Sequence, residues 1–186
     1  MNKHLEPVFN VLLLGLEKAE IDYWVYGGIS IAALVGKFIR TNKDVDIFVK
    51  ETDYQKVKSI LEDLCSKNNY SPISCTPLKK TKRPKLDIKI NKEERLSVVS
   101  IYLKNNSVEF RFWKGPEKYP HEILEKVKRN ISGYRFFTPQ NEYIKKLFIN
   151  YLRSRRDKIN KEKLQIDARA ILTKNERSKI FKKDSV

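Results

Sequence analysis

Cysteine and histidine, the usual protein ligands of zinc, are scarce in this chain. It has two cysteines, Cys65 and Cys75, and two histidines, His4 and His121, in 186 residues. Neither cysteine belongs to a CxxC pair or has a histidine nearby, so the sequence supports neither a zinc site nor a disulfide framework. Neither histidine adjoins a nucleophile motif, so no Ser-His or Cys-His pair is visible. Two free thiols in a reducing cytoplasm are expected.

Long hydrophobic runs are also missing. The most apolar stretch, "VFNVLLLGL" at residues 8–16, is too short to cross a bilayer. It lacks the small-residue cleavage pattern of a signal peptide and continues directly into Glu17 and Lys18. We therefore predict an amphipathic first helix over 4–20, a cytoplasmic protein and no membrane partner.

Acidic residues are few in the second part of the chain. The first 78 residues hold 9 lysines and arginines against 10 acidic residues, whereas the remaining 108 hold 30 against 13. The first 78 residues thus have a net charge of −1 and the remaining 108 a net charge of +17. The strongly positive second part suits a polyanionic partner such as nucleic acid or nucleotide phosphates. A solvated, lysine-rich surface explains the same numbers equally well.

The pattern of elements predicts an α/β (α+β) fold. An apolar fraction of 40% suffices for a packed core. Period-two alternation predicts strands, and amphipathic spacing predicts helices. Expected strands are 22–28, 43–50, 85–91, 95–104 and 108–113, with a hairpin turn at 105–106, and expected helices are 4–20, 29–36, 52–65, 141–156 and 161–172. We predict a mixed sheet packed by helices over 1–137, a basic helical segment over 138–186, and fraying of the last ten residues.

Two aspartates stand out in "WVYGGISIAALVGKFIRTNKDVDIFV", residues 24–49. Asp44 and Asp46 are two positions apart, so on a strand both leave the same face. Carboxylates that close repel unless a cation lies between them, and Mg²⁺ accepts carboxylate oxygens while keeping positions for phosphates. A solvent-facing acidic pair is the alternative. The preceding Gly27-Gly28 turn opens an apolar helix, whose N-terminal N–H groups suit phosphate.

This stretch resembles the nucleotidyltransferase superfamily, which has a DNA polymerase beta-like fold. Its signature is a Gly-Gly or Gly-Ser turn, a helix, and a strand bearing Asp-x-Asp. The chain is most similar to the antibiotic nucleotidyltransferases acting on aminoglycosides at the 2''-hydroxyl and on lincosamides. The elements that carry the resemblance are Gly27-Gly28, the helix 29–35, Gly36, Arg40-Thr41 and Lys43-Asp44-Val45-Asp46.

The resemblance implies a nucleoside triphosphate substrate, with ATP preferred, and two Mg²⁺ ions. Phosphates would be held by Gly27, Gly28, Ser30 and Arg40. The segments "TPQNEYIKKL" and "QIDARAIL" are similar to C-terminal helices of the family, which would bring Lys146, or its neighbour Lys145, toward the phosphates. Asp167 is either part of that helix site or a structural partner of the basic tail.

The family has a third carboxylate on a neighbouring strand. We assign it to Asp87 in "KLDIK", as a catalytic residue and metal ligand beside Asp44 and Asp46, with a further role as general base. Glu109 is the second choice. Alternatively "SVVSIYL" is the strand that carries the acid in relatives, in which case Ser100 replaces it and activity is weak or absent.

The acceptor is left open by the sequence. The leading hypothesis is transfer of a nucleoside monophosphate to a hydroxyl of a small molecule such as a lincosamide or aminoglycoside. The second is a toxin-type enzyme that modifies tRNA or a protein, which would suit the basic second part and its aromatic residues. The third is a catalytically silent module that binds nucleotide or RNA. A homodimer that completes the acceptor site is also compatible with the sequence. The aromatics in question are Tyr119, Tyr134, Phe136 and Tyr151.

Overall fold

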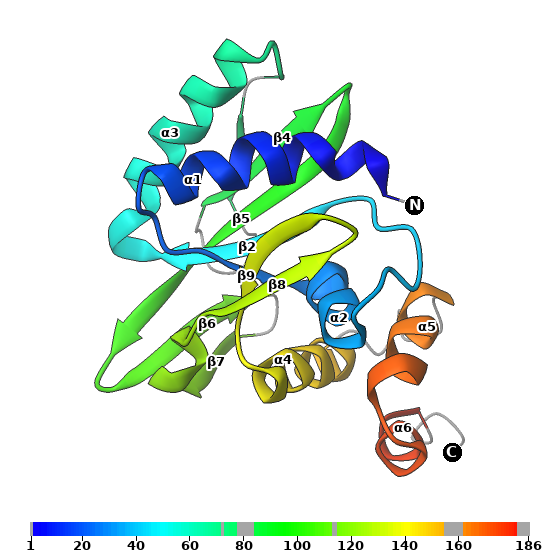
Figure 1. Cartoon of the computed structure of the whole chain (residues 1–186). Helices are drawn as coiled ribbons and strands as arrows, with labels where there is room; N and C mark the ends of the chain where they lie inside the picture. The colour runs from blue at the N-terminus through cyan, green and yellow to red at the C-terminus, as the bar shows by residue number, and fades with distance from the viewer. Residues whose placement is uncertain (1, 72, 78–83, 113–114, 155–161, 182–186) are drawn as a thin grey trace.

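The structure is a computed structural model of the chain, and it describes residues 2–71, 73–77, 84–112, 115–154 and 162–181 (Figure 1). Within these ranges, no helix is both long and apolar enough to pass through a membrane. The N-terminal elements are η1 (Lys3–Leu5), η2 (Val8–Leu13), α1 (Leu14–Lys18), β1 (Trp24–Tyr26), α2 (Gly27–Val35), β2 (Val45–Lys50), η3 (Glu51–Asp53) and α3 (Tyr54–Lys67). The others are β3 (Ser74–Pro77), β4 (Pro84–Ile90), β5 (Glu93–Lys104), β6 (Ser107–Phe112), β7 (Gly115–Pro120), η4 (His121–Leu124), β8 (Val127–Ile131), β9 (Tyr134–Thr138), α4 (Asn141–Ser154), α5 (Glu162–Ile171) and α6 (Lys174–Phe181).

A mixed sheet forms the centre of the fold. Its strands run in the order β1-β2-β5-β4-β3, and β6 pairs with the far part of the long strand β5 and with β7. The β2–β5 pair is parallel and the other pairs are antiparallel. Strand β5 therefore lies between β2, which carries Asp46, and β4, which carries Asp87.

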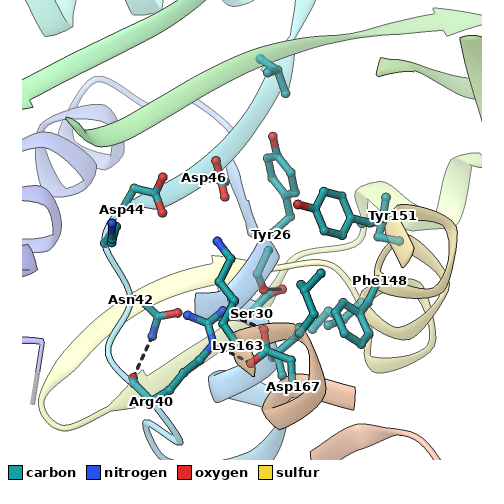
Figure 2. Close-up of a pocket in the computed structure, with 18 of the residues that line it drawn as sticks. Tyr26, Ser30, Arg40, Asn42, Asp44, Asp46, Phe148, Tyr151, Lys163 and Asp167 are labelled. Atoms are coloured by element: carbon teal, nitrogen blue, oxygen red, sulfur yellow. Dashed lines mark hydrogen bonds and ion pairs between the residues drawn. The ribbon is translucent and has the colours of Figure 1, made fainter. Parts of the chain in front are cut away.

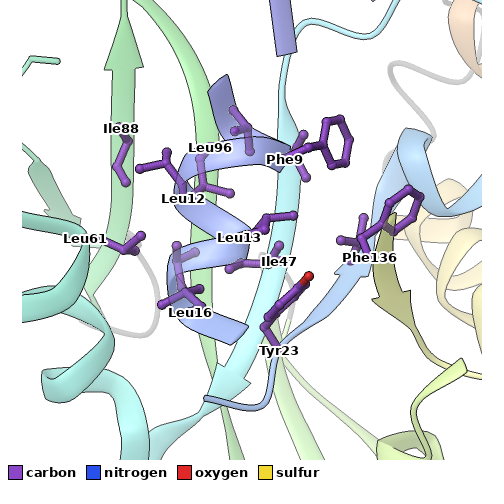
Figure 3. Packing of buried hydrophobic residues seen from close by; sticks show 14 of the residues in the cluster. Phe9, Leu12, Leu13, Leu16, Tyr23, Ile47, Leu61, Ile88, Leu96 and Phe136 are labelled. Atoms are coloured by element: carbon purple, nitrogen blue, oxygen red, sulfur yellow. The ribbon is translucent and has the colours of Figure 1, made fainter. Parts of the chain in front are cut away.

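One face of the sheet is covered by η2, α1 and α3 (Figure 3). Alternate residues of β2, such as Val45 and Ile47, point to this face and are fully buried. The hairpin of β8 and β9 closes the same core, where Phe9 stacks on Tyr134 at 4.7 Å between ring centroids and also contacts Phe136. Apolar burial on this face fixes the register of β2 and so sends Asp46 to the other face.

The C-terminal helices pack against α2. Ile31 of α2 shares a buried cluster with side chains of α4 and α5, among them Phe148 and Leu164. Arg40, in the loop after α2, holds Asp167 of α5 with two hydrogen bonds: Nε donates to Oδ1 at 2.8 Å and Nη2 donates to Oδ2 at 2.7 Å. This bidentate ion pair connects helix α5 to the loop after α2. The division into domains 1–137 and 138–186 stays a prediction.

Most predicted elements are present, and several others were missed. The structure adds β3, β7 and the β8–β9 hairpin, none of which the sequence reading assigned. It also extends helix into the last ten residues, because α6 runs to Phe181 where fraying was expected, while 182–186 lie outside the described residues. Helix α2 begins at Gly27 itself rather than at Ile29. The two glycines therefore belong to the first helical turn.

We predict that the Arg40–Asp167 pair contributes strongly to stability. Its side chains are only 14% and 2% exposed, so the Asp167→Ala substitution leaves a guanidinium buried without its carboxylate. The expected loss is about 3–5 kcal/mol in the free energy of unfolding, measured by urea denaturation. Asp63→Ala is the matched control, because the Asp63–Lys67 pair is more than half exposed and should contribute at most about 1 kcal/mol. Equal losses in the two variants would contradict the prediction.

Candidate active site

A row of polar side chains crosses the sheet on the face opposite α1 and α3. Tyr26 of β1 lies beside Asp46 of β2, Asp46 beside Ser97 of β5, and Ser97 beside Asp87 of β4. Residues directly opposite each other on paired strands share a face of the sheet. The row thus places two carboxylates on one face, separated by the Ser97 hydroxyl.

A cavity of about 520 Å³ opens at the Asp46 end of this row. Both Asp44 and Asp46 line it, and the predicted phosphate-binding residues Gly27, Gly28, Ser30 and Arg40 line it as well. Figure 2 shows the aspartates facing Tyr26, with Arg40 and Asp167 on the α5 side and Tyr151 and Phe148 on the α4 side. Residues from β1, α2, the loop before β2, α4 and α5 therefore meet at one place.

The Asp46 carboxylate lies against the backbone of Gly27. A Cβ atom added at Gly27 would stand 2.8 Å from Asp46 Oδ2, closer than real side chains come. Gly27 also has a φ of +69°, which disfavours any residue with a Cβ. Glycine is required here for two reasons, and the absent side chain leaves space beside the carboxylate.

Gly28 serves a different contact. An added Cβ would meet Arg40 Nη2 at 2.3 Å and Asn42 Oδ1 at 2.4 Å, so the loop of residues 37–44 packs directly on this glycine. Asn42 is buried, its N–H donates to Asn2 Oδ1 at 2.7 Å, and its carbonyl accepts from His4 Nε2 at 2.7 Å. The N-terminal segment thereby fixes the loop that presents Asp44.

Asp44 and Asp46 offer hard oxygen donors in a partly enclosed cavity. Mg²⁺ is commonly held by one or two carboxylates together with substrate phosphates, so this pair and the space beside Gly27 fit such an ion. Burial raises the pKa of the neighbouring Tyr26 phenol, and the charges of Asp46 and Asp44 raise this pKa further. Tyr26 therefore remains a protonated hydroxyl beside the carboxylates at neutral pH.

Asp87 lies on the same face of the sheet as Asp46, and its charge, like those of Asp46 and Asp44, raises the pKa of the Tyr26 phenol. One whole strand lies between β2 and β4, so the Asp87 and Asp46 backbones are about 10 Å apart. Asp87 Oδ1 accepts a hydrogen bond from Ser97 Oγ at 3.0 Å and pairs with Lys85 Nζ at 2.5 Å. Among the described residues, no three His, Cys, Asp or Glu side chains gather into a metal-binding group. Asp87 is not among the described residues that line the cavity, and its expected role as a third metal ligand and general base stays a prediction.

The two alternatives for the third carboxylate, Ser100 and Glu109, lie outside the described lining of the cavity. Ser100 is opposite Val49 on the parallel pair β2–β5, hence on the other face of the sheet from Asp46. The residue of β5 that does lie opposite Asp46 is Ser97. Glu109 is buried on β6, opposite Tyr102 and Lys118, outside the described lining of the cavity.

The predicted phosphate-binding residues divide into three groups. Ser30 is buried and its hydroxyl donates to the Gly27 carbonyl at 2.8 Å, so it braces the first turn of α2. Arg40 uses Nε and Nη2 for Asp167, which identifies Asp167 as a structural partner of this loop. Lys146 is exposed, 3.6 Å from Glu142 and over the Tyr143 ring, and does not belong to the described cavity lining. The approach of Lys146, or of Lys145, to the phosphates stays a prediction; Lys145 lies 3.9 Å from Glu176.

Several cavity residues were not anticipated as site residues. Lys85 enters the cavity wall from β4, Lys163 from α5 and Glu117 from β7. Glu117 Oε2 accepts hydrogen bonds from Tyr119 OH at 2.7 Å and from Asn150 Nδ2 at 3.3 Å. Lys85 had a signal in the sequence, since it lies two positions from Asp87 on the same face of a predicted strand. Glu117 had none, because β7 was not predicted.

The aromatic residues proposed for RNA stacking are mostly structural. Tyr119 and Phe136 are buried in two different parts of the core, and Tyr134 is half-buried and stacked on Phe9. Tyr151 is the exception, 37% exposed and part of the cavity wall. A stacking surface for single-stranded RNA is therefore not formed by these four side chains.

Comparison with known structures shows the same fold. The lincosamide antibiotic adenylyltransferase LnuA, in a crystal structure with lincomycin bound, matches with a TM-score of 0.62 and 21% identity, over 89% of this chain and 94% of LnuA. ANT(2'')-Ia in complex with adenylyl-2''-tobramycin matches with a TM-score of 0.61 and 12% identity, over 96% of this chain and 95% of that one. A putative nucleotidyltransferase from Thermotoga maritima matches with a TM-score of 0.58 and 14% identity, over 85% and 91%.

Sequence comparison assigns the family. No curated protein sequence gives a significant match. The family model described as aminoglycoside-2''-adenylyltransferase matches residues 8–103, more than half of the chain, including the glycine pair and both cavity aspartates. The resemblance and the mixed-sheet fold predicted from the sequence are confirmed. This chain belongs to the aminoglycoside-2''-adenylyltransferase family of nucleotidyltransferases.

Proposed function

We propose that the protein transfers an adenylyl group from ATP to a hydroxyl group of a small antibiotic, with Mg²⁺ held by Asp44 and Asp46. The observation that carries the proposal is the pair of aspartates in one cavity, with the Gly27 backbone against Asp46. Family membership supports the adenylyl donor, and the antibiotics bound by the two neighbours support the acceptor. Because ATP is a cytoplasmic nucleotide, we place the enzyme in the cytoplasm.

The reaction joins the acceptor oxygen to the α-phosphorus of ATP, breaks the bond between that phosphorus and pyrophosphate, and releases the proton of the acceptor hydroxyl, for which Asp87 stays the predicted base. A metal bound at the site would supply positive charge to the phosphates as the leaving group departs. Asp44 and Asp46 would hold that ion, while the N-terminal residues of α2, Gly27 and Gly28, line the same cavity and suit phosphate. Tyr26, whose pKa is raised by burial and by the nearby aspartates, stays a protonated phenol beside Asp46. The helices α4 and α5 line the cavity with apolar side chains such as Phe148 and Leu164.

The charge of the cavity favours an acceptor of low charge. The described lining holds as many cations as anions: Arg40, Lys43, Lys85 and Lys163 against Asp44, Asp46, Glu117 and Asp167. Asp44 and Asp46 are the proposed metal ligands, and Asp167 pairs with Arg40. Glu117 is therefore the one carboxylate of the described lining that we assign to binding the acceptor. Tyr119 OH holds it in place, and burial raises the pKa of that phenol, so the donor stays protonated.

One carboxylate beside Phe148 and Tyr151 fits a molecule with a single amine and an apolar part. A polycationic aminoglycoside would leave most of its ammonium groups without a partner. We therefore place lincosamides ahead of aminoglycosides. A tRNA acceptor, and a second copy of the chain at the acceptor site, stay predictions from the sequence.

We predict that Asp46→Asn lowers turnover by at least about 100-fold, because a neutral amide no longer holds the metal against the phosphates. The measurement is pyrophosphate release from ATP with Mg²⁺ and lincomycin. Asp63→Asn, which removes an acid from an exposed face of α3, should leave turnover unchanged. Retained ATP binding together with wild-type turnover in Asp46→Asn would contradict the assignment. A protein that binds ATP but never turns over would instead be the silent module.

The two positive-φ glycines that flank α2 allow a matched comparison. Gly27→Ala and Gly36→Ala should each lose about 1–2 kcal/mol of stability, because both positions have a φ that disfavours alanine. At Gly36 nothing lies within 4 Å of the added Cβ, whereas at Gly27 the Cβ would collide with Asp46 Oδ2. We expect a loss of adenylyl transfer in Gly27→Ala alone. Equal activities, at a temperature where both variants are folded, would show that the contact with Asp46 is unimportant.

The acceptor class can be tested by competition. In a reaction that contains ATP, Mg²⁺ and equimolar lincomycin, tobramycin and bulk tRNA, we expect lincomycin to be the acceptor that becomes adenylylated. Its kcat/KM should exceed that of the aminoglycoside by about tenfold or more, the size of one charged contact. In Glu117→Gln this preference should shrink while ATP binding is unchanged. Adenylylated tobramycin as the main product would overturn the low-charge acceptor.

A further inference from the structure

The two cavity aspartates are held in different ways. Asp46 belongs to β2, whose backbone pairs with β1 on one side and with β5 on the other. Asp44 precedes Val45, the first residue of that strand, and so lies outside the pairing of the sheet. It is the last residue of the loop that connects α2 to β2. The position of the Asp44 carboxylate therefore depends on the contacts that hold this loop.

Side chains of the N-terminal segment bind the backbone of the loop just before Asp44. Asn2 Nδ2 donates to the Arg40 carbonyl at 3.2 Å, and Asn2 Oδ1 accepts from the Asn42 N–H at 2.7 Å. His4 Nε2 donates to the Asn42 carbonyl at 2.7 Å. These two side chains thus make three hydrogen bonds to the backbone of one loop.

Arg95 binds the peptide group that leads directly into Asp44. Its Nη1 donates to the Lys43 carbonyl at 2.9 Å, and its side chain is 11% exposed. This carbonyl lies in the same planar peptide unit as the Asp44 Cα atom, so holding the carbonyl restricts the orientation of that unit. Arg95 comes just before Leu96, which lies opposite Val45 at the start of the β2–β5 pair. The arginine therefore extends the connection between these strands to the residue before Asp44.

The residues that hold the loop are themselves fixed by other contacts. Leu5, which follows His4 in η1, is fully buried in the core, and its N–H donates to the Asn2 carbonyl at 3.0 Å. Arg95 Nη2 forms an ion pair with Glu93 of the same strand. Both supports of the loop therefore belong to packed or paired parts of the fold.

Resting on the proposed function, we propose that Asn2, His4 and Arg95 are positioning residues that hold Asp44 in place for the divalent cation. None of the three is among the described residues that line the cavity, so they act through the loop backbone and not on the substrate. Residues that orient a metal ligand typically change metal affinity by about 10- to 100-fold when they are lost. Asp46 keeps its place through the strand pairing of β2, so the effect passes through Asp44.

The test measures metal binding to the full chain. Mn²⁺ alone is titrated and followed by electron paramagnetic resonance, and α,β-methylene-ATP with Mg²⁺ is titrated calorimetrically. His4→Phe keeps a ring and removes its N–H donor, and Arg95→Met keeps an unbranched side chain without the guanidinium. We expect each variant to bind Mn²⁺ about tenfold more weakly than the wild type. His4→Gln, whose amide donates to a carbonyl at similar reach, should restore most of the affinity.

Asn2→Gly tests the third residue without straining the backbone. Asn2 has a φ of +65°, which glycine adopts readily, so this substitution removes the two side-chain hydrogen bonds and keeps the conformation. We expect a loss of Mn²⁺ affinity of about tenfold here as well. Combining Arg95→Met with Asp44→Asn should weaken Mn²⁺ binding no further than Asp44→Asn does, because both act through the same carboxylate.

Arg177→Met is the matched control. Arg177 also donates from Nη1 to a backbone carbonyl at 2.9 Å, that of Leu172, but it lies on α6 and outside the described lining of the cavity. This variant should bind Mn²⁺ and the ATP analogue as the wild type does. Thermal unfolding shows that each variant is folded at the temperature of the titrations.

The outcomes separate this inference from the function on which it rests. A wild-type protein that binds no Mn²⁺ would overturn the metal site of the proposed function and the positioning role with it, whether or not the ATP analogue binds. If the wild type binds Mn²⁺, normal Mn²⁺ affinity in His4→Phe, Arg95→Met or Asn2→Gly would overturn the role of that residue alone. An equal loss of affinity in Arg177→Met would show that Mn²⁺ binding follows general stability, and would contradict the inference.

Discussion

The contact between the Asp46 carboxylate and the backbone of Gly27 sets the geometry of the site. Helix α2 can begin directly after β1 because Gly27 accepts a positive φ and has no side chain to displace the carboxylate. Gly28 then lets the loop of residues 37–44 pack on the same turn. That loop carries Arg40, which holds α5 through Asp167. The absence of a side chain at Gly27 and at Gly28 thus allows the start of α2, the loop of residues 37–44 and helix α5 to take their positions.

The sequence predicted this part well because its signals are local. Strand alternation around Asp46, the glycine pair and the apolar run of α2 all concern residues that are neighbours in the chain. The β8–β9 hairpin was missed because its charged residues, such as Lys128 and Arg135, take exposed positions on short strands with no strong apolar pattern. Strand β7, with a proline at each end of "GPEKYP", gave no strand signal at all.

The strand that separates Asp87 from Asp46 could not be predicted from the sequence, for a different reason. Period two shows which face of a strand a residue occupies, but it does not show which strand lies beside it. The long strand β5 follows β4 in the chain yet inserts between β4 and β2 in the sheet. Hence alternation could predict the face that Asp87 occupies, but not the insertion of β5 between β4 and β2. Sequence reasoning placed the substitute serine at Ser100, whereas the parallel register puts Ser97 opposite Asp46.

The insertion of Ser97 changes the electrostatics of the row. Three carboxylates meeting at one point would repel one another and could coexist only with more than one divalent cation. Here a neutral hydroxyl stands between Asp46 and Asp87, and the charge of Asp87 is matched by Lys85. The charges of Asp44 and Asp46, the proposed metal ligands, together equal that of one divalent ion. Although the chain has a net charge of +16, the described lining of its cavity contains equal numbers of cationic and anionic side chains.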